Sequence, residues 1–275
     1  MRRNGFIILD DLVDSRNIRN CHFKFNYNGQ EYYYKRSDLP DMVYNELVGE
    51  ELAKDFGIRH AEYDLASYHG NLGVISKNFI KKDEIFCTAS DLLDDMIRKE
   101  DKYPLTQFNN LKLYKKILPE SVFKDVLRLF VFDVICANND RHDENFGFVF
   151  NRKTGDMRLA PIYDNENIMS LDAIYEGRYH LGVDEKDHDR FDINYQYMRF
   201  SDDDMIVKFV EKYGKMEYIR RKLSILSKKN IDSIIERVED KIEDEIPRVI
   251  KSDINCKLTT NKEIVSQKLR LIRRG

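Results

Sequence analysis

Hydrophobic and polar residues alternate in the first third of the chain in a way that is typical of strands. The sequence predicts strands at residues 6–9, 22–27, 30–35, 58–67 and 71–75. Two of these strands flank Asn28 and Gly29, a dipeptide that favours a two-residue hairpin turn. Residues 41–56 instead place apolar side chains at helical spacing, and Gly57 is suited to end that helix. The first third therefore predicts a small antiparallel sheet with one helix.

The rest of the chain has the periodicity of helices, interrupted by one hairpin. Residues 122–137 are apolar on nearly every side, which predicts a buried helix rather than an amphipathic surface helix. Aromatic residues at 146–150, a polar turn and a returning segment at 157–162 predict the hairpin. Further helices are expected at residues 91–97, 111–118, 202–213, 218–226 and 231–250, with a solvated basic helix from residue 257.

Composition and charge argue against several classes of partner. The 275 residues are enough for one large domain or two small ones. Charged residues make up 35% of the chain but the net charge is only −3, so we expect no direct binding to nucleic acid or to anionic membranes. We find no apolar run of transmembrane length and no signal-peptide core. The four cysteines lack paired spacing, which predicts reduced thiols and a cytoplasmic location.

The densest group of polar residues follows directly after the buried helix. Asp140, His142 and Asn145 lie within this segment, and the hairpin would return Asp164 beside them. In phosphoryl transfer, one carboxylate positions the attacking hydroxyl, while an amide and a second carboxylate hold Mg²⁺ against the nucleotide phosphates. A loop rich in Asn and Asp is also typical of a plain solvated turn, but the return of a second aspartate favours the catalytic interpretation. His142 has no partner at ligand spacing, which argues against a His/Cys metal site.

The order of these residues resembles a known family. Asn-x-Asp-Arg-His-x-x-Asn at residues 138–145, followed by Leu-Ala-Pro-Ile-Tyr-Asp at residues 159–164, is similar to the catalytic core of HipA-like serine/threonine kinases. The resemblance implies an α+β, bilobal protein-kinase-like fold. Residues 1–82 would form a small antiparallel sheet with one helix that contacts the nucleotide phosphates. Residues 83–275 would form a larger, mainly helical lobe with the catalytic loop and the metal site.

The resemblance also implies ATP and Mg²⁺ as cofactors and assigns roles to the polar residues. Asp140 would be the catalytic base, with His142 beside it in the catalytic loop, and Asn145 and Asp164 would hold Mg²⁺. One position departs from the family pattern, because HipA itself carries a lysine where this chain has Glu144. If that lysine steadies the transferred phosphate, then Arg141, His142 or another basic group must replace it, or the activity is weaker.

Two further residues are expected to form the ion pair that orders the phosphate-binding lysine of kinases. Lys35 lies near the end of a predicted strand and would reach the α- and β-phosphates. Glu46 lies in the first turns of the following helix, and its Asn-Glu context matches the family. Spacing alone does not exclude Glu50 and Glu51 as the partner of Lys35, and all three glutamates are also compatible with an exposed helix face.

The segments that would contact the rest of the nucleotide have weaker signals. The chain has no Gly-x-Gly-x-x-Gly or Walker motif, so the candidate phosphate turn contains Ser15 and Arg16, with Ser15 a candidate autophosphorylation site by analogy. A plain surface turn is an equally good interpretation of that segment. Phe79 and Ile80 follow the last predicted strand and would line the adenine site.

These patterns favour an ATP- and Mg²⁺-dependent serine/threonine protein kinase of the HipA-like type. Its acceptor would be a protein, and the resemblance raises a toxin role with an antitoxin-like partner. Related catalytic loops occur in phosphatidylinositol kinases, so a kinase for phosphatidylinositol or a small molecule on a similar fold is one alternative. A second alternative is a catalytically weak nucleotide-binding regulatory module, against which the joint presence of Asp140, Asn145 and Asp164 argues.

Overall fold

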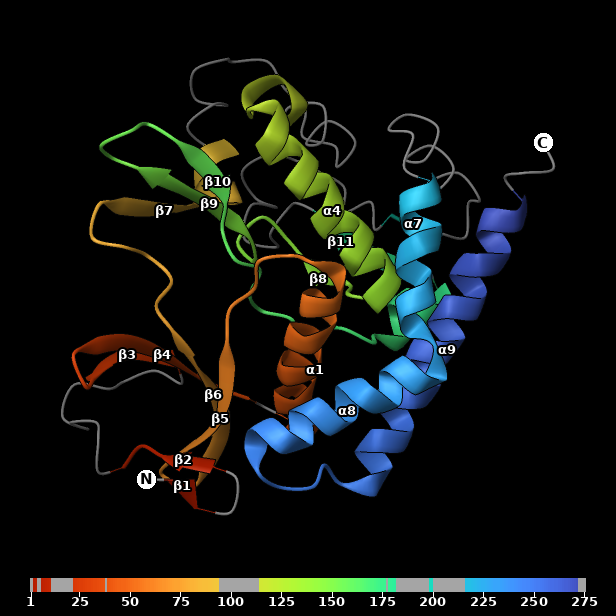
Figure 1. The fold of residues 1–275 in the computed structure, drawn as a ribbon, viewed down its shortest axis with the longest axis horizontal. Helices are drawn as coiled ribbons and strands as arrows, with labels where there is room; N and C mark the ends of the chain where they lie inside the picture. Colours follow the sequence, from red (N-terminus) through yellow and green to blue (C-terminus); the bar gives the residue numbers. More distant parts are fainter. Residues whose placement is uncertain are drawn as a thin grey trace, which may run out of the picture.

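The computed structural model describes residues 2–3, 6–10, 22–37, 39–93, 114–176, 178–181, 198–199 and 216–271. These residues form a mixed α+β fold in which strands predominate in the first part of the chain and helices in the last part (Figure 1). Helix α1 (Pro40–Phe56) lies between the main sheet and the later helices, with contacts to both. The candidate phosphate turn with Ser15 and Arg16 lies outside the described residues.

The main sheet has six strands within the described part of the chain. They are β1 (Arg2–Arg3), β2 (Phe6–Ile8), β3 (His22–Tyr27), β4 (Gln30–Arg36), β5 (Tyr63–Tyr68) and β6 (Asn71–Lys77). Their spatial order is β1-β2-β5-β6-β4-β3, and every pair is antiparallel except β2 and β5. Asn28 and Gly29 close the predicted β3–β4 hairpin with positive φ angles of 50° and 76°. The predicted helix at residues 41–56 is also confirmed, and Gly57 ends it with a φ of 69°.

The prediction of a strand over residues 58–67 is only partly correct, because β5 begins at Tyr63. The preceding residues extend toward a different partner. Ala61 donates its N–H to the carbonyl oxygen of Ile162 at 2.8 Å, and Ile162 donates to the carbonyl oxygen of Arg59 at 2.8 Å. This short parallel contact connects the sheet region to the segment that carries Asp164.

A second sheet forms around the predicted hairpin, with a strand that the sequence pattern did not indicate. Its strands are β7 (Glu84–Thr88), β9 (Gly147–Asn151) and β10 (Met157–Leu159), in the antiparallel order β10-β9-β7. No element is predicted from the sequence at residues 85–88, which lie in β7. The strand forms because its backbone pairs with β9 across about sixty residues of sequence, a partner that local periodicity does not reveal.

Buried helix α4 (Glu120–Cys136) confirms the prediction for the apolar run. Beyond it lie β8 (Asp140–Arg141), the π-helix η2 (Asp172–Glu176), β11 (Arg178–Leu181) and β12 (Met198–Arg199), and these three strands form a third small sheet. The last helices are α7 (Met216–Leu223), the 3-10 turn η4 (Ser224–Leu226), α8 (Lys228–Ile242) and α9 (Arg248–Leu271). The expected helix at 202–213 lies outside the described residues.

The prediction of one helix over residues 231–250 is wrong, because the chain breaks between α8 and α9. Glu243 adopts a left-handed backbone with φ of 58°, and Pro247 immediately precedes α9. The C-terminal helix is also not merely solvated. It buries a stripe of apolar side chains against α4 and its neighbours, formed by Ile254, Leu258, Val265 and Leu269.

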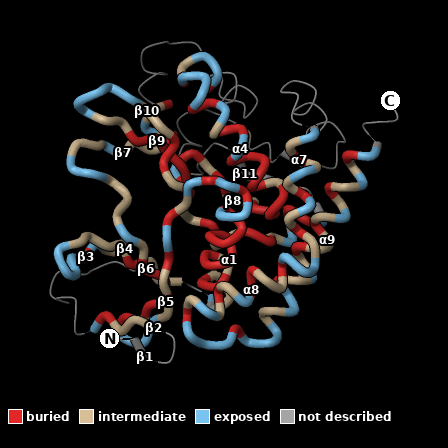
Figure 2. Tube along the Cα trace, viewed as in Figure 1, coloured by how far each residue is buried: buried red, intermediate tan, exposed pale blue. Residues whose placement is uncertain are grey.

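Buried residues concentrate on α1, α4 and the inner faces of the last helices (Figure 2). One large cluster of apolar side chains joins α1, α4, the hairpin and α7 to α9, and a smaller cluster lies within the main sheet. Helix α1 therefore belongs to the same core as the helices that follow the hairpin. In the described part of the chain, no helix combines the length and the apolarity needed to cross a membrane.

Candidate active site

The polar segment begins where α4 ends inside the protein. Ala137 has a left-handed backbone, with φ of 54°, which turns the chain away from the helix axis. Asn138 donates from Nδ2 to Asp133 Oδ1 at 3.0 Å and accepts the N–H of Asp140 at 3.1 Å. Since Asn138 and Asp133 are fully buried, these bonds fasten the start of the loop to the core of the helix.

Arg141 is a fully buried cation that joins α4 to both polar loops. Its guanidinium lies 3.2–3.3 Å from the carboxylate oxygens of Asp133. It also donates to the carbonyl oxygens of Asn145 and Tyr163, at 2.8 and 2.6 Å, and to Asn165 Oδ1 at 2.6 Å. The alternative in which Arg141 contacts a transferred phosphate is therefore wrong, because its donors are used within the interior.

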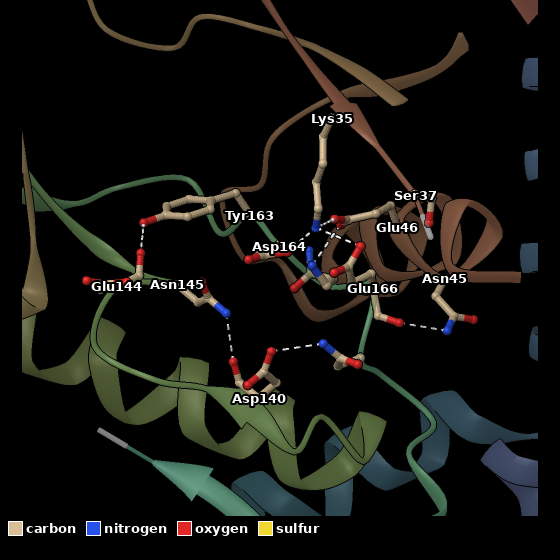
Figure 3. A network of polar contacts seen from close by, with 12 residues as sticks. Lys35, Ser37, Asn45, Glu46, Asp140, Glu144, Asn145, Tyr163, Asp164 and Glu166 are labelled. Carbon is tan, nitrogen blue, oxygen red and sulfur yellow. Dashed lines mark hydrogen bonds and ion pairs between the residues drawn. The ribbon is translucent and has the colours of Figure 1, made fainter. Parts of the chain in front are cut away.

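Asp140 and Asn145 lie side by side in this loop (Figure 3). Asn145 donates from Nδ2 to the carbonyl oxygen of Asp140 at 2.9 Å, so its Oδ1 is turned elsewhere and has no partner among the described residues. The carboxylate of Asp140 is half-buried and accepts a hydrogen bond from Asn167 Nδ2 at 2.9 Å. Asn167 thus restricts the orientation of the predicted base, a contact that the sequence did not indicate.

The hairpin returns the chain to the loop, as the sequence predicts. Tyr163 donates its hydroxyl to the carbonyl oxygen of Glu144 at 2.7 Å, which places the next residue, Asp164, opposite Asn145 and Asp140 (Figure 3). Asp164 has a positive φ of 57°. His142 is half-buried, and its Nδ1 accepts the N–H of Glu144 at 3.3 Å.

Lys35 extends from β4 into a group of three carboxylates. Its Nζ lies 3.0 Å from Glu46 Oε1 and 2.9 Å from Glu166 Oε2, and it also contacts Asp164 Oδ1 (Figure 3). The side chain is only 22% exposed. Although burial alone would lower the pKa of Lys35, the neighbouring Glu46, Asp164 and Glu166 carboxylates raise it, so the ammonium stays charged.

These contacts show which of the three candidate glutamates on α1 pairs with Lys35. Glu46 faces Lys35, whereas Glu50 contacts Lys241 and Lys54, and Glu51 contacts Lys54 and Arg237. Glu46 and Glu50 are each 1% exposed, and Glu51 is 4% exposed, so the interpretation of an exposed helix face is wrong for all three.

Glu46 also fixes the segment that follows Asp164. Its Oε2 accepts the N–H of Asn165 at 2.7 Å, while Asn45 donates from Nδ2 to the carbonyl oxygen of Glu166 at 2.8 Å. Burial raises the pKa of Glu46 to about 7; Lys35 opposes this rise and the nearby carboxylate of Asp164 adds to it.

Gly49 lets this segment approach α1 closely, because a Cβ at Gly49 would lie 2.8 Å from the Cβ of Asn165. The absence of a side chain at Gly49 therefore permits the contact between α1 and the residues after Asp164.

Glu166, Asn167 and Tyr63 are site residues that the sequence interpretation missed. Glu166 and Asn167 directly follow the Asp164 motif and continue its run of polar residues, which was the available signal. The sequence around Tyr63 gives no such signal, because this residue lies in a strand with an ordinary alternation of polar and apolar residues. Its hydroxyl nevertheless accepts the N–H of Asp164 at 3.1 Å.

Three aromatic rings contact one another next to Asp164 in the chain, with Tyr163 as the member that directly precedes it. Phe79 lies near Tyr163 in a stacked arrangement at 6.4 Å and near Phe86 edge-on at 5.9 Å, and Phe86 is 6.0 Å from Tyr163. Ile80 is half-buried, and its N–H donates to Asn78 Oδ1 at 2.9 Å. Phe79 therefore lies beside the segment that leads to Asp164, and Ile80 follows Phe79 in the chain.

The chain belongs to the HipA-like C-terminal domain family, whose model matches residues 14–246. This confirms the resemblance found in the sequence. Among curated proteins, the serine/threonine-protein kinase CtkA of Helicobacter pylori (strain J99) is 25% identical over 136 residues. That match covers 48% of this chain and only 42% of the length of the relative.

Solved structures extend the likeness over almost the whole chain. The crystal structure of the Helicobacter pylori proinflammatory kinase CtkA superposes with a TM-score of 0.69 and covers 94% of both chains at 18% identity. HipA of Shewanella oneidensis MR-1, solved with HipB and its operator DNA, gives a TM-score of 0.60 at 18% identity. That match covers 96% of this chain and 69% of the other. At this identity, the likenesses establish the fold.

Proposed function

We propose that this chain is an ATP- and Mg²⁺-dependent serine/threonine protein kinase of the HipA-like type. The observation that carries the proposal is the convergence of Lys35, Glu46 and Asp164 from three separate elements beside the loop of Asp140 and Asn145. A sheet lobe at residues 1–82 and a helical lobe at residues 83–275 would enclose the nucleotide between them. The matched family and the fold of CtkA and HipA support this proposal.

The residues on the sheet side would bind the nucleotide. Lys35 supplies a charged ammonium for the α- and β-phosphates, and Glu46 holds its position from α1. Phe79 and Ile80 would line the base, next to the aromatic rings of the second sheet. Ser15 and Arg16 remain the predicted phosphate turn.

The residues on the loop side fit a magnesium ion. Asn145 has its Nδ2 engaged, which leaves the amide oxygen to face a cation, and Asp164 adds a carboxylate that is 26% exposed. Oxygen donors of this kind suit Mg²⁺, and one ammonium among Glu46, Asp164 and Glu166 leaves an excess of negative charge. When bound, Mg²⁺ would neutralise charge on the nucleotide phosphates.

Asp140 would act on the acceptor hydroxyl. Its carboxylate is half-buried and held on one oxygen by Asn167, so it is oriented before a substrate arrives. His142 lies two residues further along the loop; if the family lysine steadies the transferred phosphate, His142 or another basic group would take its place. Catalysis would rest mainly on positioning and on charge neutralisation.

The acceptor would be a serine or threonine of a protein, in a cytoplasmic setting. The Shewanella HipA structure contains the HipB protein and operator DNA, which supports an antitoxin-like partner for this chain. Our expectation that this chain itself makes no direct contact with nucleic acid follows from its net charge and stays a prediction.

The proposal is tested with labelled ATP and Mg²⁺, using the wild type, Asp140→Ala and Asp164→Ala. We expect label on Ser or Thr only in the wild type. Asp140→Ala should retain nucleotide binding, whereas Asp164→Ala should lose the part that depends on Mg²⁺. Asp156→Ala, in the exposed hairpin turn, is the matched control and should behave as wild type. Unchanged transfer in either site variant would refute the assignment.

A further inference from the structure

Tyr63 reaches Asp164 from β5, outside both polar motifs. The backbone N–H of Asp164 donates to Tyr63 Oη at 3.1 Å, and Tyr63 is only 5% exposed. The φ of Asp164, 57°, lies in the left-handed region that residues other than glycine seldom occupy, although aspartate enters it more readily than most. A hydrogen bond to this N–H fixes the peptide plane that precedes the carboxylate.

Two consecutive N–H groups of the loop are held by side chains from different elements. Tyr63 accepts from Asp164, and Glu46 accepts from Asn165 at 2.7 Å. Glu46 is already ordered by its ion pair with Lys35. The hydroxyl of Tyr63 therefore provides a second constraint on the loop, one that does not pass through Lys35.

Tyr63 is itself anchored to the helical region. Its N–H donates to Glu50 Oε2 at 2.8 Å, and Glu50 is 1% exposed. Lys241 of α8 lies 2.7 Å from both carboxylate oxygens of Glu50, and Lys54 lies 2.9 Å from Oε1. A continuous set of polar contacts thus runs from α8 through α1 and β5 to the backbone of Asp164.

We propose that Tyr63 is a positioning residue that sets the orientation of Asp164 for binding a nucleotide-associated divalent cation. This inference rests on the proposed function, because it concerns the same cation site. Tyr63 touches neither the carboxylate of Asp164 nor any reacting group; it acts through the backbone. Removing the hydroxyl takes away the partner of this part-buried N–H and frees the peptide to rotate.

The test compares Tyr63→Phe with Tyr68→Phe in the full chain. Both change a buried tyrosine of β5, but Tyr68 packs against the rings of Phe23 and Tyr34 in the sheet cluster, away from Asp164. Calorimetry measures the affinity for ADP with Mg²⁺ and with EDTA. We expect Tyr63→Phe to reduce the Mg²⁺-dependent gain in affinity by about three- to tenfold, with affinity in EDTA unchanged. Tyr68→Phe should keep the wild-type gain.

Hydrogen exchange of the ligand-free protein gives a second readout. The amides of Asp164 and Asn165 should exchange faster in Tyr63→Phe than in Tyr68→Phe, while those of α4 should not change. Wild-type Mg²⁺ dependence in Tyr63→Phe would overturn the inference and leave the proposed function intact. If the wild type binds no ADP with Mg²⁺, the proposed function fails, and the inference fails with it.

Discussion

Arg141 Nη2 lies 3.2 Å from Asp133 Oδ1, and both side chains are completely buried. Taking two charges out of water costs several kcal/mol per ion, so such a pair persists only when its remaining donors are satisfied. Here they are, because Arg141 also bonds the carbonyl oxygens of Asn145 and Tyr163. The pair therefore fixes α4, the loop of Asp140 and the segment before Asp164 as one unit.

Replacing Arg141 by methionine should destabilise the protein by about 3–5 kcal/mol, because Asp133 would be left as an unpaired buried charge. Urea unfolding measures the loss. The exposed hairpin residue Arg152 is the matched control, and Arg152→Met should change stability by less than about 0.5 kcal/mol. Adding Asp133→Leu should restore only part of the loss, since the carbonyl oxygens of the two loops stay unsatisfied. A loss below 1 kcal/mol in Arg141→Met, about the value of an exposed ion pair, would contradict this role.

The buried position of Glu46 predicts an unusual pH dependence. Its pKa in the folded protein is about 7, above its ordinary value near 4.5, so folding favours the protonated carboxyl. Its contribution to stability is fully present below about pH 4.5 and is lost as pH rises to 7. Over this pH interval, the free energy of unfolding of the wild type should therefore fall by up to about 3 kcal/mol relative to that of Glu46→Gln. Urea unfolding without nucleotide measures this difference.

Glu51, on the same helix, provides a control because its pKa is shifted in the opposite direction to that of Glu46. Despite burial, the hydrogen bonds from Lys54 and Arg237 lower the pKa of Glu51. Its contribution is present above the ordinary pKa and is lost as pH falls below about 4.5. In Glu51→Gln, the free energy of unfolding should therefore change between pH 4.5 and 7 by the same amount as in the wild type. If the difference in free energy of unfolding between wild type and Glu46→Gln stays constant across this interval, Glu46 is ionised throughout.

Local patterns were sufficient for the elements that depend on nearby residues. The β3–β4 hairpin follows from Asn28 and Gly29, the end of α1 from Gly57, and α4 from its uninterrupted apolar run. Long-range pairing was not visible in the sequence. Strand β7 exists because β9 lies beside it, and the break between α8 and α9 depends on the left-handed Glu243 together with Pro247.

In the candidate site, too, local motifs predicted some residues, whereas the roles of others depend on long-range contacts. The family motif led to Lys35, Glu46, Asp140, Asn145 and Asp164, which the structure brings together. Arg141, by contrast, was a candidate phosphate ligand. An arginine in a polar loop gives no sign of burial, and only the distant Asp133, Tyr163 and Asn165 show that its donors are used internally. Contacts across the fold, rather than residue type, decide such roles.

For Gly49→Ala, the sign of the change in stability shows whether the segment after Asp164 packs against α1. In a helix, this change ordinarily stabilises by about 1 kcal/mol. Here the new Cβ would lie 2.8 Å from the Cβ of Asn165, so we expect a destabilisation of about 1–3 kcal/mol and weaker Mg²⁺-dependent ADP binding. Urea unfolding and calorimetry measure the two effects. In an Asn165→Gly background the clash is removed, and Gly49→Ala should become neutral or stabilising. Stabilisation in the wild-type background would show that the segment is not packed against α1.

Asn261 connects α9, which lies beyond the residues matched by the family model, to the end of α4. Its Nδ2 donates to the carbonyl oxygens of Val134 and Ile135 at 3.0 and 2.8 Å, and the residue is 1% exposed. These carbonyls belong to the last turn of α4, where carbonyl oxygens commonly accept hydrogen bonds from side chains. Asn261→Leu should remove both of these hydrogen bonds and cost about 1–3 kcal/mol in urea unfolding.

The same substitution at Asn255 separates this effect from a general loss in α9. Asn255 donates only to the carbonyl oxygen of Lys251 within its own helix, and its Oδ1 has no partner among the described residues. Asn255→Leu should therefore be close to neutral. Because Asp140 lies only three residues after Ala137, where α4 ends, Asn261→Leu should also lower phosphoryl transfer under conditions where the protein stays folded. Equal stability of the two variants would show that α9 packs against α4 through its apolar stripe alone.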